Sequence, residues 1–336
     1  MPLFFSFIKM KNIKVAINGF GRIGRTLFRI LHEREGIEVV AVNDVADLKP
    51  LAHLLKYDSI HRTFSADVQT SENGFIVDGN PVSYSQESDL DKLCWTNCDV
   101  VIEATGKFLT KSDLQKHLKA GASKVILSAP PIGDSIKMIV LGVNDSILKS
   151  SDLIVSNASC TTNSAAPMVQ LIDTFFGVEQ AYITTIHSYT TDQSLHDTPH
   201  KDLRRARAGA LSIIPTTTGA AKAVSKIFPH LEIGGCGIRV PVPNGSLTDI
   251  TFVVKKNCTI EQVNRVFLEA SKNSHKNYVS YTEDPIVSID VVGNTSSCLF
   301  DAQLTSVLGK MVKIVSWYDN ETGYANRLAD LIFRIN

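Results

Sequence analysis

The sequence predicts an α/β protein in which a doubly wound parallel sheet is followed by a second, α+β domain. Its 336 residues exceed what one hydrophobic core usually organises, so two domains are expected. Between residues 13 and 160, short runs rich in Val and Ile alternate with helix-like segments. Near-continuous apolar runs are typical of strands buried on both faces, as in a parallel sheet. After residue 160, longer strand-like runs follow one another with few helices, which favours an antiparallel or mixed sheet.

The first half supplies the βαβ units. Helix-like segments occupy residues 23–33 and 111–120, and Gly121 closes the second of them. The predicted strands lie at residues 13–18, 37–43, 99–105, 124–129, 138–143 and 153–157. Strands and helices in turn are the pattern of a doubly wound sheet.

The second half opens with a helix after Cys160, because apolar residues recur at helical spacing from Met168 to Phe175. Thr259 and Gln262 resemble a capping box that opens a further helix through Ala270. The predicted strands of this half lie at residues 179–189, 236–243, 246–256 and 310–319.

These elements divide the chain. We expect residues 1–10 to be an N-terminal extension, residues 11–159 to form the first domain and residues 160–322 the second. A last helix at about residues 323–336 ends the chain, and its pattern leaves open which domain it returns to.

Composition excludes some classes of function. Lys and Arg together number 34, as do Asp and Glu, and this balance argues against a nucleic-acid groove. No run reaches the ~18 apolar residues of a membrane span. The six cysteines lack paired spacing, which predicts a reducing, cytoplasmic location and no metal site.

A glycine-rich turn follows the first predicted strand. The stretch "INGFGRIGR" places Gly19, Gly21 and Gly24 at the start of a helix, and Asp44 ends the second strand. Glycines let the backbone approach a pyrophosphate, the helix N-terminus favours its charge, and the acid can accept ribose hydroxyls. The sequence therefore predicts a dinucleotide site in a Rossmann-type domain.

The stretch "SNASCTTN" places Cys160 at the carboxyl end of the strand at residues 153–157 and at the N-terminus of the next helix. Ligands bind at such strand ends, and a helix N-terminus lowers the pKa of a thiol toward the thiolate. A thiolate nucleophile needs a base, and His187, which ends the strand-like run "YITTIH", is the candidate.

Taken together, these motifs resemble phosphorylating glyceraldehyde-3-phosphate dehydrogenase. The match runs from Lys11 to the C-terminus and includes "NGFGRIGR", "SNASCTTN", "HSYTTDQ", "HKDLRRARAGALSIIPTTTGAAKAV", "RVPVPNGSLTD" and "SWYDNETGYANRL". The resemblance implies NAD as cofactor, glyceraldehyde 3-phosphate and inorganic phosphate as substrates, and a homotetramer with no nucleic-acid or membrane partner.

The resemblance also implies roles by position. Cys160 matches the nucleophile and His187 the base. Residues that match the substrate-phosphate site are Thr190, Asp192, Arg207 and Arg239, and those that match the site for attacking phosphate are Ser159, Thr161, Thr218 and Gly219. Residues that match cofactor contacts, besides the glycines, are Arg22, Ile23, Asp44, Thr105, Ser128 and Asn320. Two guanidinium groups suit a phosphomonoester, while Arg204 and Arg205 fit a solvated basic face.

Three positions depart from the family pattern. Ser164 stands where relatives commonly have a second cysteine, which rules out a disulfide between it and Cys160. Arg62 occupies a place usually held by Gly, and residues 83–89 lack a basic residue often found near the adenine.

The predicted reaction is attack of the Cys160 thiolate on the aldehyde, oxidation to a thioester, and release of 1,3-bisphosphoglycerate by inorganic phosphate. Three alternatives remain at this point. One is erythrose-4-phosphate dehydrogenase, with water as acceptor. The others are a cysteine hydrolase that uses no NAD, and a non-catalytic protein that binds NAD or RNA.

Overall fold

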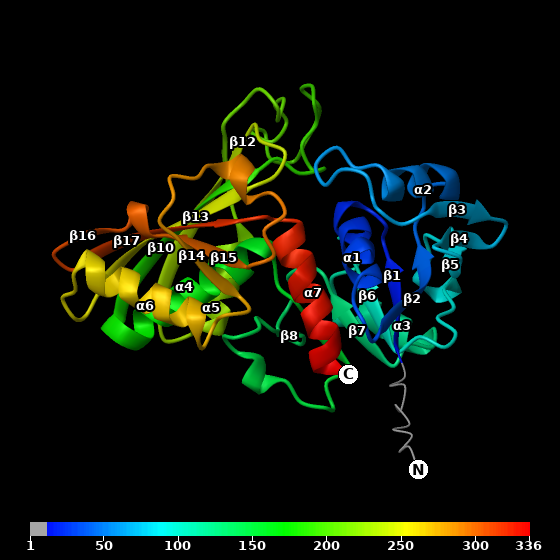
Figure 1. The fold of residues 1–336 in the computed structure, drawn as a ribbon, viewed down its shortest axis with the longest axis horizontal. Helices are drawn as coiled ribbons and strands as arrows, with labels where there is room; N and C mark the ends of the chain where they lie inside the picture. The colour runs from blue at the N-terminus through cyan, green and yellow to red at the C-terminus, as the bar shows by residue number, and fades with distance from the viewer. Residues whose placement is uncertain (1–11) are drawn as a thin grey trace, which may run out of the picture.

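The computed structural model describes residues 12–336, so the expected extension at residues 1–10 lies outside the described residues. Two sheets lie beside each other in Figure 1, one built from the first half of the chain and one from the second. The predicted fold class, a doubly wound parallel sheet with a second α+β unit, is confirmed.

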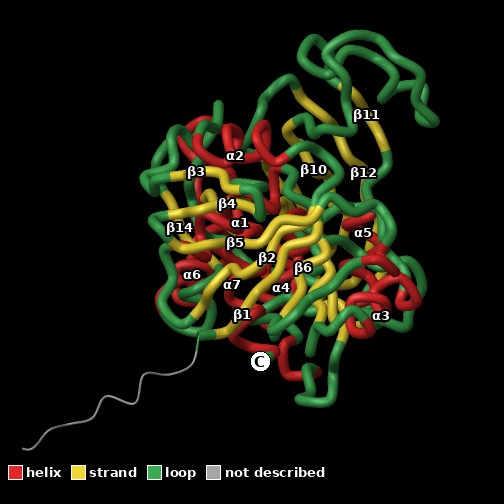
Figure 2. Tube along the Cα trace, turned by 90° about the vertical axis from the view of Figure 1, so that its right-hand side faces the viewer, coloured by secondary structure: helices red, strands yellow, loops and turns green. Residues whose placement is uncertain are grey.

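The first sheet has the strand order β3-β4-β5-β2-β1-β6-β7-β9-β8. Pairing is parallel from β5 to β8, and β3, β4 and β5 form an antiparallel edge. Figure 2 shows β5, β2, β1 and β6 side by side. The strands are β1 (Ile13–Asn18), β2 (Ile37–Asn43), β3 (Val68–Ser71), β4 (Gly74–Val77), β5 (Asn80–Ser85), β6 (Val100–Glu103), β7 (Lys124–Leu127), β8 (Lys137–Met138) and β9 (Ile154–Ser156).

The helices that accompany this sheet are α1 (Arg22–His32), α2 (Leu48–Lys56), α3 (Lys111–Lys119) and the C-terminal α7 (Thr322–Ile335). Tyr324, Leu328 and Ile332 of α7 share a hydrophobic core with β1 and α1. Arg34, which follows α1, pairs with Asp330 of α7 at 2.6 Å. The last helix therefore packs on the first sheet, and on this packing we propose that it belongs to the first domain.

The second sheet has the order β11-β12-β10-β13-β17-β15-β14, and β16 pairs with β17. Its core lies between the sheet and helices α4 and α6, where Met168, Phe267 and Phe252 are buried together. The elements are α4 (Cys160–Phe176), β10 (Val178–Ser188), β11 (Ile214–Thr216), α5 (Gly219–Ile227), β12 (Glu232–Val240), β13 (Ser246–Val254), α6 (Ile260–Lys272), β14 (Val279–Thr282), β15 (Cys298–Asp301), β16 (Ser306–Leu308) and β17 (Met311–Tyr318). The predicted capping box of Thr259 and Gln262 is confirmed at α6.

Some predicted elements differ from the structure. The strand expected at residues 138–143 ends at Met138 as β8, residues 139–140 are irregular, and residues 141–143 lie in a turn. The apolar run was informative about burial only, because Ile139 and Leu141 are buried without being in a strand. Phe175 was expected on the buried face of α4, but it is exposed and Phe176 is buried instead.

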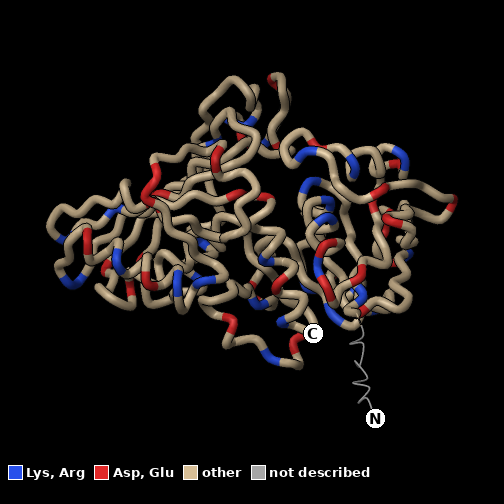
Figure 3. The backbone as a smooth tube through the Cα atoms, in the orientation of Figure 1, with Lys and Arg blue, Asp and Glu red and all other residues tan. Residues whose placement is uncertain are grey.

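The sequence reading also missed α2 and the edge strands β3, β4 and β5. The outer strand β3 is short and mostly exposed, so it lacks the apolar run that indicates a buried strand. Charged residues of both signs are spread over both halves in Figure 3. Within residues 12–336, every helix is too short or too polar to cross a membrane.

Candidate active site

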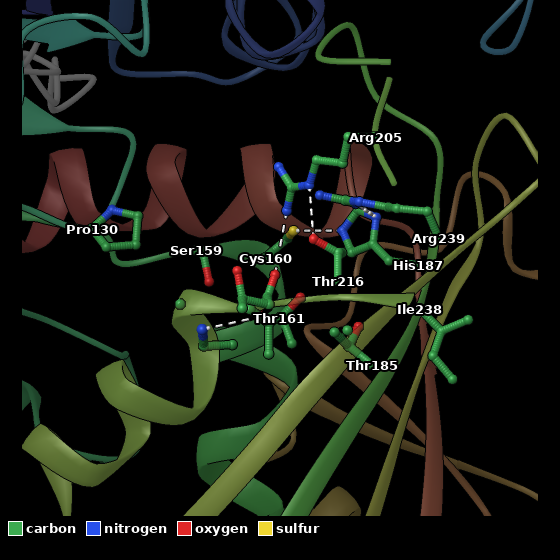
Figure 4. Close-up of a pocket in the computed structure, with 15 residues that line it drawn as sticks. Pro130, Ser159, Cys160, Thr161, Thr185, His187, Arg205, Thr216, Ile238 and Arg239 are labelled. Carbon is green, nitrogen blue, oxygen red and sulfur yellow. Dashed lines mark hydrogen bonds between the residues drawn. The ribbon is translucent and has the colours of Figure 1, made fainter. Parts of the chain in front are cut away.

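A cavity of about 200 Å³ lies at the N-terminus of α4 (Figure 4). The strands β9, β10 and β12 end around it, so residues that are distant in sequence meet there. Its lining consists of Pro130, Ser159, Cys160, Thr161, Thr185, His187, Arg205, Thr216, Thr217, Thr218, Gly219, Ala220, Gly237, Ile238 and Arg239.

Cys160 is the first residue of α4, and Ser159 is its N-cap. The Ser159 hydroxyl accepts a hydrogen bond from the Thr162 backbone N–H at 3.1 Å. The turn before it is tight, because Ala158 has a φ of 53°, a conformation that side-chain-bearing residues rarely adopt. This turn fixes the thiol at the helix N-terminus, pointing into the cavity.

His187 lies at the end of β10, and its Nε2 is 3.4 Å from the Cys160 sulfur. Its Nδ1 is 2.7 Å from the Ser188 carbonyl oxygen, which only accepts. A ring proton on Nδ1 donates to this oxygen and leaves Nε2 to accept the thiol proton, whereas Arg239 Nη1, which also contacts Nδ1, can only donate. Burial, and next the charge of Arg239, lower the pKa of His187 to about 3, so the ring is neutral at neutral pH.

Burial raises the pKa of the Cys160 thiol, whereas the charge of Arg239 and the Thr161 backbone N–H act in the opposite direction. The expected lowering of this pKa by the helix N-terminus is thus outweighed by desolvation. A buried thiol that meets a neutral imidazole nitrogen can ionise by passing its proton to that nitrogen.

Arg239 lies beside His187 because β10 and β12 are parallel and pair these two residues in register. Its Nη1 contacts His187 Nδ1 and donates to the Ser188 carbonyl oxygen at 3.1 Å. Burial lowers the pKa of Arg239, but a guanidinium remains charged at neutral pH. A cation in this position favours an anionic ligand in the cavity.

The second arginine of the cavity is Arg205 and not Arg207. The Arg205 guanidinium donates to Asp192 at 2.7 Å and to the Thr216 hydroxyl at 2.9 Å. Arg207 is 67% exposed and binds Asp197 outside the lining. The expectation that Arg205 lies on a solvated face is therefore wrong, since Arg205 lines the cavity with Arg239 (Figure 4).

The other predicted phosphate residues divide into two groups. Ser159, Thr161, Thr218 and Gly219 all line the cavity. The Thr218 hydroxyl caps α5 by accepting from the Ala220 N–H at 3.2 Å, so a second helix N-terminus faces this space. Asp192 contacts the cavity through Arg205, and Thr190 lies outside the lining.

A separate cavity of about 190 Å³ lies at the carboxyl ends of β1, β2 and β6. Its lining consists of Asn18, Gly19, Gly21, Asn43, Asp44, Val45, Glu87, Ser88, Ala104, Thr105, Lys107 and Phe108. Four of the residues predicted to contact the cofactor are among them.

The three glycines of this loop differ in what surrounds them. A Cβ on Gly19 would lie 2.6 Å from the Thr105 nitrogen, and one on Gly24 would lie 2.2 Å from the Gly19 oxygen. A Cβ on Gly21, the N-cap of α1, would meet no atom within 4 Å. Gly19 and Gly24 therefore permit close packing of the backbone. Gly21 leaves open space in front of the helix N-terminus.

The lining of this cavity suits the adenosine and pyrophosphate parts of a dinucleotide. Open space at the N-terminus of α1 suits a pyrophosphate, and Asp44, one residue beyond β2, suits ribose hydroxyls. One Asp44 oxygen already accepts from the Phe20 N–H at 2.7 Å, which ties the acid to the glycine loop.

The remaining predicted cofactor residues lie outside this lining. The Arg22 guanidinium is bound by Asp58 and Glu321, so its side chain is occupied. Ile23 packs against the first core, and the Ser128 N–H donates to the Glu103 carbonyl oxygen.

Asn320 is buried, and its Oδ1 accepts from the Ser188 and Ser246 hydroxyls at 2.9 Å each. These bonds orient the amide so that its NH₂ group is the end left for a ligand. Ser188 therefore has two contacts: its carbonyl oxygen contacts the base His187, and its hydroxyl contacts Asn320.

The three departures from the family pattern can be located in the structure. Arg62 has a φ of 66°, the left-handed conformation that favours the Gly usual at this place. Ser164 lies in a buried hydroxyl cluster, 3.0 Å from both Ser316 and Thr248. In the segment 83–89, the Ser85 hydroxyl and the Glu87 N–H donate to the Asn43 amide oxygen.

Sequence reasoning missed Arg205, Thr216 and Thr185 as lining residues. The run "DLRRARA" alone carries no signal that separates Arg205 from Arg207, because the loop conformation decides which guanidinium faces the cavity.

Comparison with known proteins gives consistent matches along the chain. Residues 13–111 match the family described as glyceraldehyde 3-phosphate dehydrogenase, NAD binding domain, and residues 159–320 match the C-terminal domain of the same name. The chain is 52% identical over 326 residues to the glyceraldehyde-3-phosphate dehydrogenase of Thermotoga maritima, covering 95% of this chain and 98% of the relative. The enzyme of Geobacillus stearothermophilus is 49% identical over 325 residues, with 95% and 97% covered. Glyceraldehyde-3-phosphate dehydrogenase 2 of Streptomyces avermitilis is 50% identical over 326 residues, with the same shares covered.

Proposed function

This chain belongs to the glyceraldehyde-3-phosphate dehydrogenase family and oxidises glyceraldehyde 3-phosphate with NAD, and we propose that Cys160 is the nucleophile of an oxidative phosphorylation. The observation that carries the proposal is the 3.4 Å contact between the Cys160 sulfur and His187 Nε2 in a cavity lined by two arginines. The product would be 1,3-bisphosphoglycerate.

Cys160 begins the reaction by passing its proton to His187 Nε2 as the sulfur attacks the aldehyde carbon. The protonated His187 then gives this proton to the oxygen of the adduct, which becomes the thiohemiacetal hydroxyl, and the Cys160 backbone N–H at the start of α4 stabilises the same oxygen. His187 then takes the hydroxyl proton as the carbon is oxidised, and a thioester remains on Cys160.

NAD, when bound, accepts the hydride that leaves the aldehyde carbon. Gly19, Gly21, Asp44 and Thr105 line the space that would hold its adenosine and pyrophosphate parts. Asn320, with its amide oriented by two serines, is proposed for the nicotinamide amide. The glycine-rich loop would be supported by Arg22, Ile23 and Gly24. Ser128 would support the far side of the cofactor.

The two phosphates are proposed to bind to different parts of the cavity. Arg239 and Arg205, the latter oriented by Asp192, suit the phosphate of the substrate because guanidinium forks bind phosphate oxygens in pairs. Ser159, Thr161, Thr218 and Gly219 offer hydroxyls and two helix N-termini for the attacking phosphate.

The test is NADH production from glyceraldehyde 3-phosphate with and without inorganic phosphate. Turnover that requires phosphate supports the proposal. Phosphate-independent formation of the free acid would instead indicate erythrose-4-phosphate dehydrogenase chemistry, with water as the acceptor. Turnover of an ester or amide without NAD would indicate a hydrolase.

We further propose that the chain forms a homotetramer in the cytoplasm. The loop between β10 and β11 extends away from the rest of the chain (Figures 1 and 2). It exposes apolar side chains, namely Leu195 (72%), Leu203 (82%), Leu211 (83%) and Ile213 (69%). Such exposure favours an interface with a second copy, which light scattering would test. All six cysteines are free thiols, which favours a reducing compartment.

A further inference from the structure

A fully buried carboxylate lies directly behind the dinucleotide cavity. Glu103 is the last residue of β6 and is 1% exposed. It lies in register with Asn18 at the end of β1, and Asn18 lies in register with Asn43 at the end of β2. Asn18 and Asn43 line the cavity, whereas Glu103 does not.

Among the described residues, Glu103 accepts from donors on both oxygens. Oε2 is 2.6 Å from Asn18 Nδ2 and 2.9 Å from His117 Nε2. Oε1 is 2.9 Å from the Thr105 backbone nitrogen and 2.5 Å from its hydroxyl. An ionised carboxylate accepts at both oxygens and donates at neither, so it satisfies all of these groups at once.

His117 is also fully buried, and its protonation follows from its partners. The Trp95 indole N–H, which only donates, is 3.0 Å from His117 Nδ1. Nδ1 is therefore the acceptor, and the ring proton lies on Nε2, facing Glu103. The neutral ring fills both roles without a conflict.

The direction of the hydrogen bonds extends from Glu103 into the cavity wall. Because Asn18 donates its NH₂ to Glu103, its Oδ1 is free to accept from Asn43 Nδ2 at 2.7 Å. Asn43 Oδ1 then accepts from the Ser85 hydroxyl and the Glu87 N–H. One carboxylate thus fixes which end of each lining amide faces which neighbour.

The same carboxylate fixes the backbone under the glycine loop. It holds the Thr105 N–H, and that nitrogen would lie 2.6 Å from a Cβ on Gly19. The Asn18 carbonyl oxygen accepts from the Ala104 N–H at 2.7 Å, and the Gly19 N–H donates to the Asn43 carbonyl oxygen at 2.8 Å. A shift at Glu103 therefore reaches the loop proposed for the pyrophosphate.

We propose that Glu103 is a positioning residue for NAD, whose buried carboxylate orients Asn18, Asn43 and Thr105 toward the cofactor, with His117 and Trp95 as its support. The inference rests on the proposed function of this cavity as the NAD site. Glu103 itself touches no cofactor atom in this proposal and acts only through the residues that line the cavity.

The test is Glu103→Gln, which keeps the shape and replaces one acceptor oxygen by a donor NH₂. Four contacts of the described residues donate to the Glu103 carboxylate. The new NH₂ would therefore leave either the Thr105 N–H or the Asn18 and His117 donors without an acceptor. We expect the dissociation constants of NAD and of ADP-ribose, measured by calorimetry, to rise by roughly 10- to 100-fold, as for a lost buried acceptor. Turnover at saturating NAD should change much less than KM for NAD.

A pair of variants at His117 checks the supporting role and does not depend on Glu103→Gln folding. His117→Gln retains one acceptor and one donor group, whereas His117→Leu retains neither. We expect NAD affinity near that of the wild type in the first and a clear loss in the second.

Asp301→Asn is the matched control in the second domain. Asp301 is also buried and accepts from an indole, that of Trp317, at 3.0 Å. The Asp301→Asn variant should lower the melting temperature and leave the NAD dissociation constant unchanged.

A folded Glu103→Gln variant, or a His117→Leu variant, with wild-type NAD affinity would overturn the inference. Wild-type protein that binds no NAD would contradict the proposed function itself.

Discussion

Arg205 and Arg207 offer a direct test of how the substrate phosphate is bound, because they lie two residues apart and differ in where they point. Arg205 lines the cavity and is fixed by Asp192 and Thr216, whereas Arg207 pairs with the exposed Asp197. Removing a hydrogen bond to a charged group costs about 1.5–3 kcal/mol. Arg205→Ala should therefore raise KM for glyceraldehyde 3-phosphate by roughly 10- to 150-fold.

Arg207→Ala is the matched control, and it should change KM by less than about threefold, as expected for an exposed ion pair. Steady-state kinetics at saturating NAD and inorganic phosphate measure both values, and NAD titrations show whether the cofactor site is intact. Arg205→Lys should lie between the two variants, because a lysine retains the charge and loses the planar fork. Equal effects of the two alanine variants, or a larger effect of Arg207→Ala, would refute the assignment of Arg205.

Three further predictions concern the nucleophile, the base and the cofactor. Cys160→Ser should retain NAD binding and lose nearly all activity. In the wild type, iodoacetate should label Cys160 faster than the other thiols, because His187 Nε2 can take its proton as the sulfur attacks; equal labelling by mass spectrometry would contradict this. His187→Asn should slow turnover by about 10²–10⁴. Because the pKa of His187 falls to about 3 from the 6.5 of an unfolded chain, the unfolded state binds the extra proton between these values, so the free energy of unfolding should fall as the pH is lowered through this range. Urea unfolding should show this pH slope flattened in His187→Asn, and an unchanged slope would count against a neutral, buried His187. Asp44→Gly should collapse the preference for NAD over NADP in kcat/KM, since the acid repels a ribose phosphate; a wild-type ratio near one would show that Asp44 does not face the ribose.

The parts of the fold that sequence predicts well are those where one local signal is enough. β1 and β2 begin and end at the predicted residues, because each is a short apolar run bounded by polar residues. The helix at α6 follows from the Thr259 capping box in the same way. The run at residues 138–143 is equally apolar, yet only Met138 lies in a strand, while residues 139–141 are buried outside any strand. Hydrophobicity alone therefore predicts burial and not strand pairing.

The residues of the candidate site also differ in whether a local sequence signal is enough to place them. Cys160 and Gly21 are at positions that a strand followed by a helix fixes locally, and the sequence locates them. Arg205 and Glu103 depend on contacts between distant segments. Glu103 is the last residue of a buried strand, where a carboxylate is costly unless it is fully hydrogen-bonded. Only the register of β1, β2 and β6 shows that Asn18 and Thr105 provide that bonding.

The proposed roles of His187 and Arg239 would link substrate binding to the strength of the base. In the structure Arg239 contacts the ring of His187, and after burial its charge is the next cause that lowers the pKa of the imidazole. On the proposed assignment of Arg239 to the substrate phosphate, that phosphate would offset the charge of the guanidinium. The pKa of His187 would then rise, and its Nε2 would become a better acceptor for the Cys160 proton 3.4 Å away. On this proposal Arg239 would serve two purposes, since the group that binds the substrate phosphate would also keep the base weak until that phosphate is in place.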